Sequence, residues 1–176
     1  MVEDEIQYAY FGGTQSNFWT KNRHYRLYMT SNEIIAIWVG NDEVPSFVGG
    51  LLGTLMALAL SKGKKKKTRD EELATKTLDE MRADHKHNYA LSLEEIESAE
   101  LLPASLLVQM NYASIKPVGV LSITCYNGKH LEFGIWSKED MEAAIDLPTS
   151  HLADRTRIKT TWDERKKQYV QMAVDG

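Results

Sequence analysis

Cysteine is almost missing from this sequence, because Cys125 is the only one among 176 residues. A single thiol excludes an intrachain disulfide and a cysteine-based metal cluster, and it favours a reducing compartment, so we expect a cytoplasmic protein. The N-terminus is acidic and polar, which argues against an ordinary secretory signal peptide. The chain also lacks a basic excess, with a net charge of −4, so we expect no general nucleic-acid binding.

Sequence motifs of catalysis are missing as well. The chain has no P-loop, dinucleotide glycine fingerprint or nucleophile elbow, and leucines occupy the positions between the glycines of residues 49–53. His85 and His87 would point about 200 degrees apart on a helix, so we expect surface residues at a helix end and no metal site. Cys125 has no evident base beside it and is expected to be a small buried hydrophobe. We therefore expect no enzyme, no metal and no cofactor.

What the chain does contain is an apolar stretch with regularly spaced small residues. Residues 44–60 carry no charge and fall a little short of the about 20 apolar residues that span a bilayer as a helix. A small residue recurs at every fourth position and would form one ridge on a helix, where another backbone can approach closely. The ridge consists of Gly49, Gly53, Ala57 and Ser61. A helix that is apolar nearly all round must be buried in protein or lie in lipid.

A block of cations follows this stretch, made of Lys62, Lys64, Lys65, Lys66, Lys67 and Arg69. Near an anionic leaflet each is worth about 1 kcal/mol, and less at high salt. Two interpretations stay open. In the first, the stretch contacts a membrane or a second copy and the cations form a basic collar. In the second, the helix packs on its own domain or in a dimer interface, and a solvated lysine linker follows.

Alternating patterns before and after the stretch predict β-strands. Residues 6–11 predict a short strand that Gly12 and Gly13 end. Residues 24–29 place Tyr25, Leu27 and Met29 on one face, and with the β-branched residues 34–39 they predict an antiparallel hairpin. Residues 70–86 predict one helix, since acidic residues stand at its start, where the helix dipole favours them.

The C-terminal half predicts a second hairpin and a helix. Residues 118–126 and 131–135 alternate around Asn127 and Gly128, which favour a two-residue type I′ turn. Ser137 is predicted to begin a helix that Pro148 stops. Residues 157–162 are predicted to add one edge strand. Residues 92–102 are ambiguous, because helix propensity alone favours a helix there.

The order of these elements resembles the pleckstrin-homology-like barrel superfamily, including its GRAM and bacterial relatives. The resemblance rests on YRLYMTSNEIIAIWVG, YALSLEEIESAEL and GVLSITCYNGKHLEFGIWSKEDMEAAIDL. It implies an α+β fold, with an antiparallel barrel or sandwich closed by a C-terminal helix, and it makes residues 96–102 a strand after a short turn. It also implies a helical insertion after the third strand, as in uncharacterised prokaryotic members. Lys21, Arg23 and Arg26 depart from the spacing of phosphoinositide-binding members, so specific phosphoinositide recognition is not expected.

The expected organisation is a discontinuous barrel of residues 1–43 and 88–148, a helical insertion of residues 44–87, and a polar tail from residue 149. We expect a non-enzymatic docking module that contacts the inner membrane face or a protein through the apolar helix and the lysine block. A homo-oligomer without a membrane role is the first alternative. The second alternative is a small ligand bound at a barrel mouth lined by Tyr8, Trp19 and Trp38.

Overall fold

The computed structural model describes residues 8–15, 22–41, 69–104 and 117–172, and the structural statements below refer to these residues. The apolar stretch of residues 44–60, the lysine block, and the loop with Phe18 and Trp19 lie outside them. Within the described part, no helix is long and apolar enough to cross a membrane.

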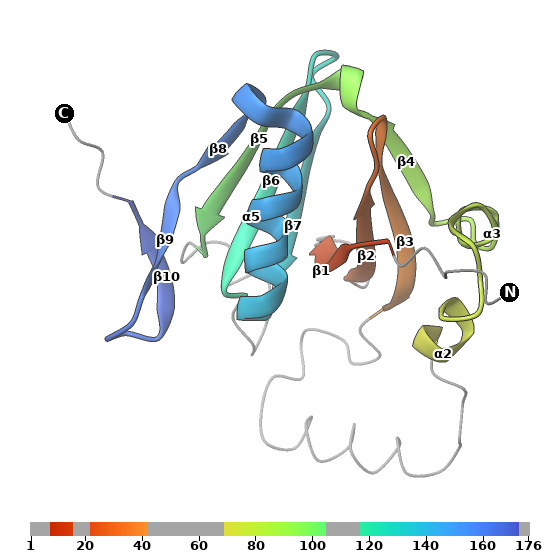
Figure 1. The fold of residues 1–176 in the computed structure, drawn as a ribbon, viewed down its shortest axis with the longest axis horizontal. Coiled ribbons are helices and arrows are strands. Elements are labelled where there is room, and N and C mark those ends of the chain that lie inside the picture. The colour runs from red at the N-terminus through yellow and green to blue at the C-terminus, as the bar shows by residue number, and fades with distance from the viewer. Residues whose placement is uncertain (1–7, 16–21, 42–68, 105–116, 173–176) are drawn as a thin grey trace, which may run out of the picture.

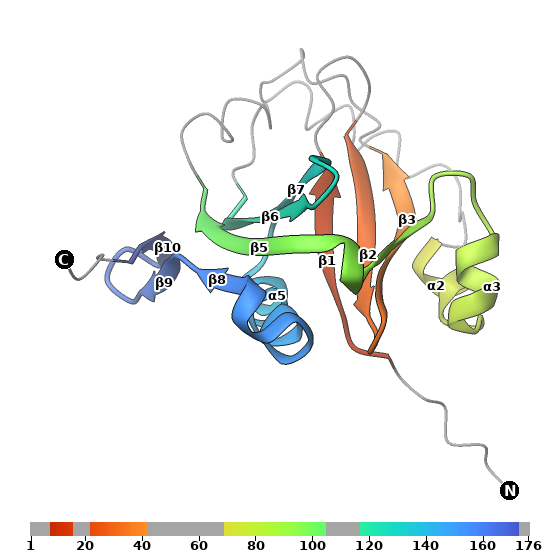
Figure 2. The ribbon, with the colours of Figure 1, turned by 90° about the horizontal axis from the view of Figure 1, so that it is seen from above.

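Eight strands form one sheet in the order β4–β3–β2–β1–β7–β6–β5–β8 (Figure 1 and Figure 2). Neighbouring strands are antiparallel except β8, which runs parallel to β5. The strands are β1 Tyr10–Gln15, β2 Arg23–Met29, β3 Glu33–Asn41, β4 Tyr89–Ser92, β5 Ile96–Pro103, β6 Gly119–Cys125, β7 His130–Ile135 and β8 Thr156–Ile158. The predicted α+β class with a mostly antiparallel sheet is confirmed. The sheet is not closed, because the edge strands β4 and β8 do not pair within the described residues.

The main core lies on the concave side of the sheet, where helix α5 (Lys138–Leu152) packs against it (Figure 2). Tyr25, Leu27 and Met29 point into this core, as the alternation predicts. Tyr25 on β2 meets Phe133 on β7 edge-on, with ring centroids 6.2 Å apart. The two halves of the sheet therefore pack face to face across one core.

Strand β1 corrects the prediction for the N-terminal strand, since Gly12 and Gly13 lie inside it and do not end it. Both glycines allow a close approach. A Cβ on Gly13 would lie 2.9 Å from a methyl group of Leu27 and 3.1 Å from the Cβ of Phe133. The Gly12 N–H donates to the Asp140 carboxylate of α5 at 2.6 Å. Glycine in a strand interior often marks a place where another part of the chain approaches closely.

The predicted single helix of residues 70–86 is wrong, because two short helices lie there, α2 (Arg69–Leu73) and α3 (Leu78–Ala83). Thr77 starts α3 with a capping box. Its side chain accepts from the Glu80 N–H, and the Glu80 carboxylate accepts from the Thr77 N–H at 2.8 Å. This reciprocal pair stabilises a helix start at Leu78 and competes with continuation of α2.

The corner between β4 and β5 confirms the turn and strand that the resemblance implies. A 3₁₀ turn, η1 (Leu93–Glu95), joins them, and the Leu93 N–H donates to the Asn32 carbonyl at 2.8 Å. Arg155, after α5, donates from Nη1 to the carbonyls of Leu93 and Ile96, each at 2.7 Å. One side chain thus ties the end of α5 to the corner of the sheet.

We expect Arg155→Met to lower the free energy of unfolding by about 2 kcal/mol, because hydrogen bonds to a charged group are worth about 1.5–3 kcal/mol and methionine keeps the stem without the donors. Urea unfolding followed by circular dichroism measures the effect. Arg155→Lys, which keeps the charge but not the forked donor, should recover part of the loss. An unchanged midpoint in Arg155→Met would show that this contact does not stabilise the corner.

The β6–β7 hairpin is confirmed, but its predicted turn type is wrong. Among residues 126–129 only Gly128 has a positive φ, of 81°, and its N–H donates to the Cys125 carbonyl at 2.9 Å. A type I′ turn would need a positive φ at Asn127 as well. Cys125 is buried in the core, as predicted, and burial raises the pKa of its thiol.

The C-terminal part differs from the prediction in two ways. Helix α5 continues past Pro148 to Leu152, and the hydroxyls of Thr149 and Ser150 donate to the carbonyls of Ile145 and Asp146 around the proline. Beyond it, residues 157–162 do not form one edge strand. Strand β8 pairs with β5, and β9 (Thr160–Asp163) pairs with β10 (Gln168–Gln171) in a separate hairpin.

Candidate functional site

Arg69 is the one predicted contact residue that the structure describes, and it is the first residue of α2. The other predicted contact residues lie outside the described ranges, namely Lys62, Lys64, Lys65, Lys66, Lys67, Gly49, Gly53, Ala57 and Ser61. Their role in binding stays a prediction. The site that can be built from side chains is therefore the place where the chain returns from this stretch to the sheet.

The helix pair α2–α3 rests on the outer face of β2 and β3 through a second, smaller apolar cluster. Its members are Tyr28, Ile35, Ile37, Leu73, Leu78 and Met81. Tyr28 lies on the face of β2 that the alternation leaves to solvent, yet it is buried here, with its hydroxyl 3.8 Å from the Met81 sulfur. The segment predicted as an insertion thus has two parts. One is the apolar stretch, and the other is the helix pair that covers the outer face of the sheet.

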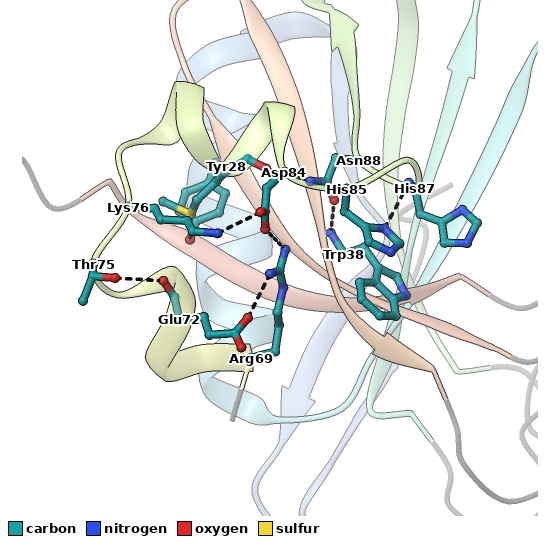
Figure 3. A network of polar contacts seen from close by, with 11 residues as sticks. Tyr28, Trp38, Arg69, Glu72, Thr75, Lys76, Asp84, His85, His87 and Asn88 are labelled. Carbon is teal, nitrogen blue, oxygen red and sulfur yellow. Dashed lines mark hydrogen bonds and ion pairs between the residues drawn. The ribbon is translucent and has the colours of Figure 1, made fainter. Parts of the chain in front are cut away.

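Asp84, just after α3, joins the two ends of the helix pair (Figure 3). Its carboxylate binds the Arg69 guanidinium and, at 2.8 Å, the Lys76 ammonium. Arg69 also contacts Glu72 at 3.1 Å. The hydrogen bonds from Lys76 and Arg69 lower the pKa of Asp84, so this clamp is complete above the ordinary pKa of an aspartate and is lost as the pH falls through the lowered pKa.

A stack of aromatic rings adjoins this clamp (Figure 3). The His85 ring lies parallel to the indole of Trp38 on β3, with centroids 4.1 Å apart, and the His87 ring lies 5.0 Å from that of His85. The two histidines are closer than helical spacing predicts, because both follow the end of α3 at Ala83. No group of three or more metal-ligating side chains occurs among the described residues.

Asn88 fastens α3 to the sheet, and nothing in the sequence marks it for this role. Its side-chain oxygen accepts from the backbone N–H of Trp38 at 2.7 Å (Figure 3). Its side-chain nitrogen donates to the Met81 carbonyl at 2.7 Å. One amide therefore bridges the last turn of α3 and strand β3.

A pocket of about 330 Å³ lies elsewhere, between β1, β2 and the start of α5. It is lined by Tyr10, Gly12, Gly13, Thr14, His24, Tyr25, Arg26, Val39, Trp136 and Asp140. The Trp136 indole donates to the Thr14 hydroxyl at 2.6 Å. The same hydroxyl lies 2.6 Å from Nδ1 of His24. Tyr8 and Trp38 do not line this pocket, and Trp19 lies outside the described residues. A ligand at the predicted mouth stays a prediction.

Comparison with known proteins found no relative of this chain, since no family model, no curated protein and no solved structure matches it.

Proposed function

We propose that this protein is a docking module of the pleckstrin-homology-like class, which attaches to an anionic membrane surface through residues 44–67. The class is supported by seven antiparallel strands followed by one amphipathic helix, β1 to β7 and then α5. It is also supported by the position of the apolar stretch, which follows the third strand as in the prokaryotic proteins that the chain resembles.

The observation that carries the proposal is the place where this stretch leaves and rejoins the sheet. Strand β3 ends at Asn41, and the chain returns at Arg69 in α2, which packs on β3. Arg69 is fixed there by Asp84. A segment tethered at both ends to one structure loses less freedom on binding than a free tail, so a contact made by it is stronger for the same chemistry.

The basic residues of this segment have two proposed roles, anchoring the segment to the sheet and contacting the membrane. Arg69 is neutralised by Glu72 and Asp84, so we assign it the anchoring role. The five lysines before it would contact the anionic head groups, and the uncharged residues 44–60 would enter the interface beside them. The cytoplasmic leaflet carries the anionic lipids that attract such polybasic segments, so the proposed location is the inner face of the membrane.

Co-sedimentation with phosphatidylcholine vesicles, with and without phosphatidylserine, tests the proposal. We expect binding to the anionic vesicles only, and release at high salt, because counterions screen the lysines. Equal recovery in the supernatant with both vesicle types would contradict membrane docking. A dimer in light scattering that Gly53→Leu dissociates would then favour the homo-oligomer instead.

A further inference from the structure

The helix pair α2–α3 is attached to the sheet by a small set of contacts that is separate from the main core. Leu73, Leu78 and Met81 supply its buried side chains, and they pack on the outer face of β2 and β3. The main core lies on the opposite face of the sheet and contains none of these residues. Such separate packing is typical of units that open locally without global unfolding.

His85 lies in the loop between α3 and β4, between Asp84 of the charge clamp and Asn88 of the amide bridge. Its ring covers Trp38, and its Nδ1 lies 3.2 Å from the backbone N–H of His87, which donates to it. A ring nitrogen accepts a hydrogen bond only when it carries no proton, so this contact requires neutral imidazole with its proton on Nε2. Protonation of Nδ1 replaces an acceptor by a second donor and breaks the bond.

We propose that protonation of His85 releases the α2–α3 pair from the sheet, so that mildly acidic pH detaches the segment that follows the lysine block while the sheet stays folded. The switch uses one side chain and one backbone donor. It does not depend on what the lysine block binds.

Two of the three charges that act on His85 disfavour its protonation. Arg69 from α2 and Lys86 from the same loop repel an imidazolium, and Asp84 attracts it. The Asp84 carboxylate is already engaged by Arg69 and by Lys76 from the turn between the helices. Arg23 from β2 acts on the neighbouring His87. The facing residues of β3 and the bridge, Trp38 and Asn88, are uncharged, and among the described residues Asp84 is the carboxylate that acts on the charged ring.

Desolvation, with the repulsion of Arg69 and Lys86, lowers the pKa of His85 in the folded protein below its ordinary value of 6.5. Because the pKa of His85 is lower in the folded than in the unfolded protein, the folded protein binds fewer protons there. The neutral ring therefore stabilises the attachment above the ordinary pKa of histidine. This stability is lost as the pH falls through the lowered pKa. The release is thus placed below the ordinary pKa of a histidine.

Hydrogen–deuterium exchange of the full chain from about pH 7.5 to about pH 5, corrected for intrinsic exchange rates, tests the switch. We expect protection of the α3 amides to fall about tenfold over this range, which corresponds to the loss of about one net hydrogen bond. Protection of β6 and β7 should stay constant. A uniform loss in all elements would show global unfolding and overturn the proposal.

Three variants separate the roles of the ring. His85→Phe keeps a stacked ring without a titrating group, and His85→Asn keeps an acceptor near the position of Nδ1. Both should make α3 protection independent of pH in this range. His87→Gln is the matched control, because it removes the adjacent imidazole and keeps the backbone donor, and it should retain most of the response. A wild-type response in His85→Phe and His85→Asn, or its loss in His87→Gln alone, would overturn the assignment to His85.

Discussion

Replacing Lys64, Lys65, Lys66 and Lys67 with glutamine is expected to weaken binding to phosphatidylserine vesicles by about three orders of magnitude at low salt. Each basic residue near an anionic surface is worth about 1 kcal/mol, and four of them sum to about 4 kcal/mol. A change of 1.4 kcal/mol is a factor of about ten in affinity. Titration with vesicles at several salt concentrations measures both the loss and its dependence on screening.

The chain offers a matched control for this loss of charge. Arg165, Lys166 and Lys167 form a second basic cluster in the exposed turn between β9 and β10. Their replacement by glutamine changes the net charge by a similar amount but leaves the proposed contact intact. We expect little change in vesicle binding. Equal weakening by both sets would mean that net charge governs binding, and the specific role of the lysine block would then be wrong.

Phe133→Ala is expected to lower the free energy of unfolding by about 3–5 kcal/mol, the range found when large aromatic side chains are removed from a core. Phe133 on β7 is 1% exposed and packs against Tyr25 on β2, with the two rings at 89°. The substitution leaves a cavity between the two halves of the sheet. Urea unfolding measures the shift of the midpoint.

Tyr126→Ala is the control on the same hairpin. Tyr126 is 66% exposed, so its removal should change the unfolding free energy by no more than about 0.5 kcal/mol. A small effect of Phe133→Ala, similar to that of Tyr126→Ala, would show that the two halves of the sheet do not share one core.

The strands could be predicted because their burial follows the alternation of the sequence. Residues 34–39 and 118–126 fall within or close to β3 and β6, and Tyr25, Leu27 and Met29 lie in the core as their period of two indicates. The sequence also predicted a C-terminal helix from Ser137, whose hydroxyl accepts from the Asp140 N–H at 3.0 Å. These features depend on neighbouring residues, which a single sequence displays.

The errors arise where distant contacts override local preference. Pro148 does not end α5, since the helix continues to Leu152 under packing that the sequence does not show. Tyr28 looks exposed by its period and is buried because α3 covers it. The pairing of β8 with β5 joins segments more than fifty residues apart, and no local pattern predicts it.

The candidate site shows the same division between local and distant signals. The basic block and the apolar stretch are visible in the sequence, whereas the pairing of Arg69 with Asp84 is not. Asp84 lies fifteen positions further on and meets Arg69 because the chain turns between α2 and α3. His85 and Trp38 are forty-seven positions apart, and their rings stack because α3 packs on β3. No local sequence pattern around either residue predicts this contact.

The most direct test of membrane docking is a fluorescent label in the middle of the apolar stretch. Leu55→Cys introduces a thiol for labelling, and the native Cys125 reacts slowly because it is buried and its pKa is raised by that burial. An environment-sensitive fluorophore on that thiol should shift to shorter wavelengths when phosphatidylserine vesicles are added, and nitroxide groups on the lipid chains should quench it. Emission that stays unchanged and unquenched in the presence of these vesicles would contradict the proposal.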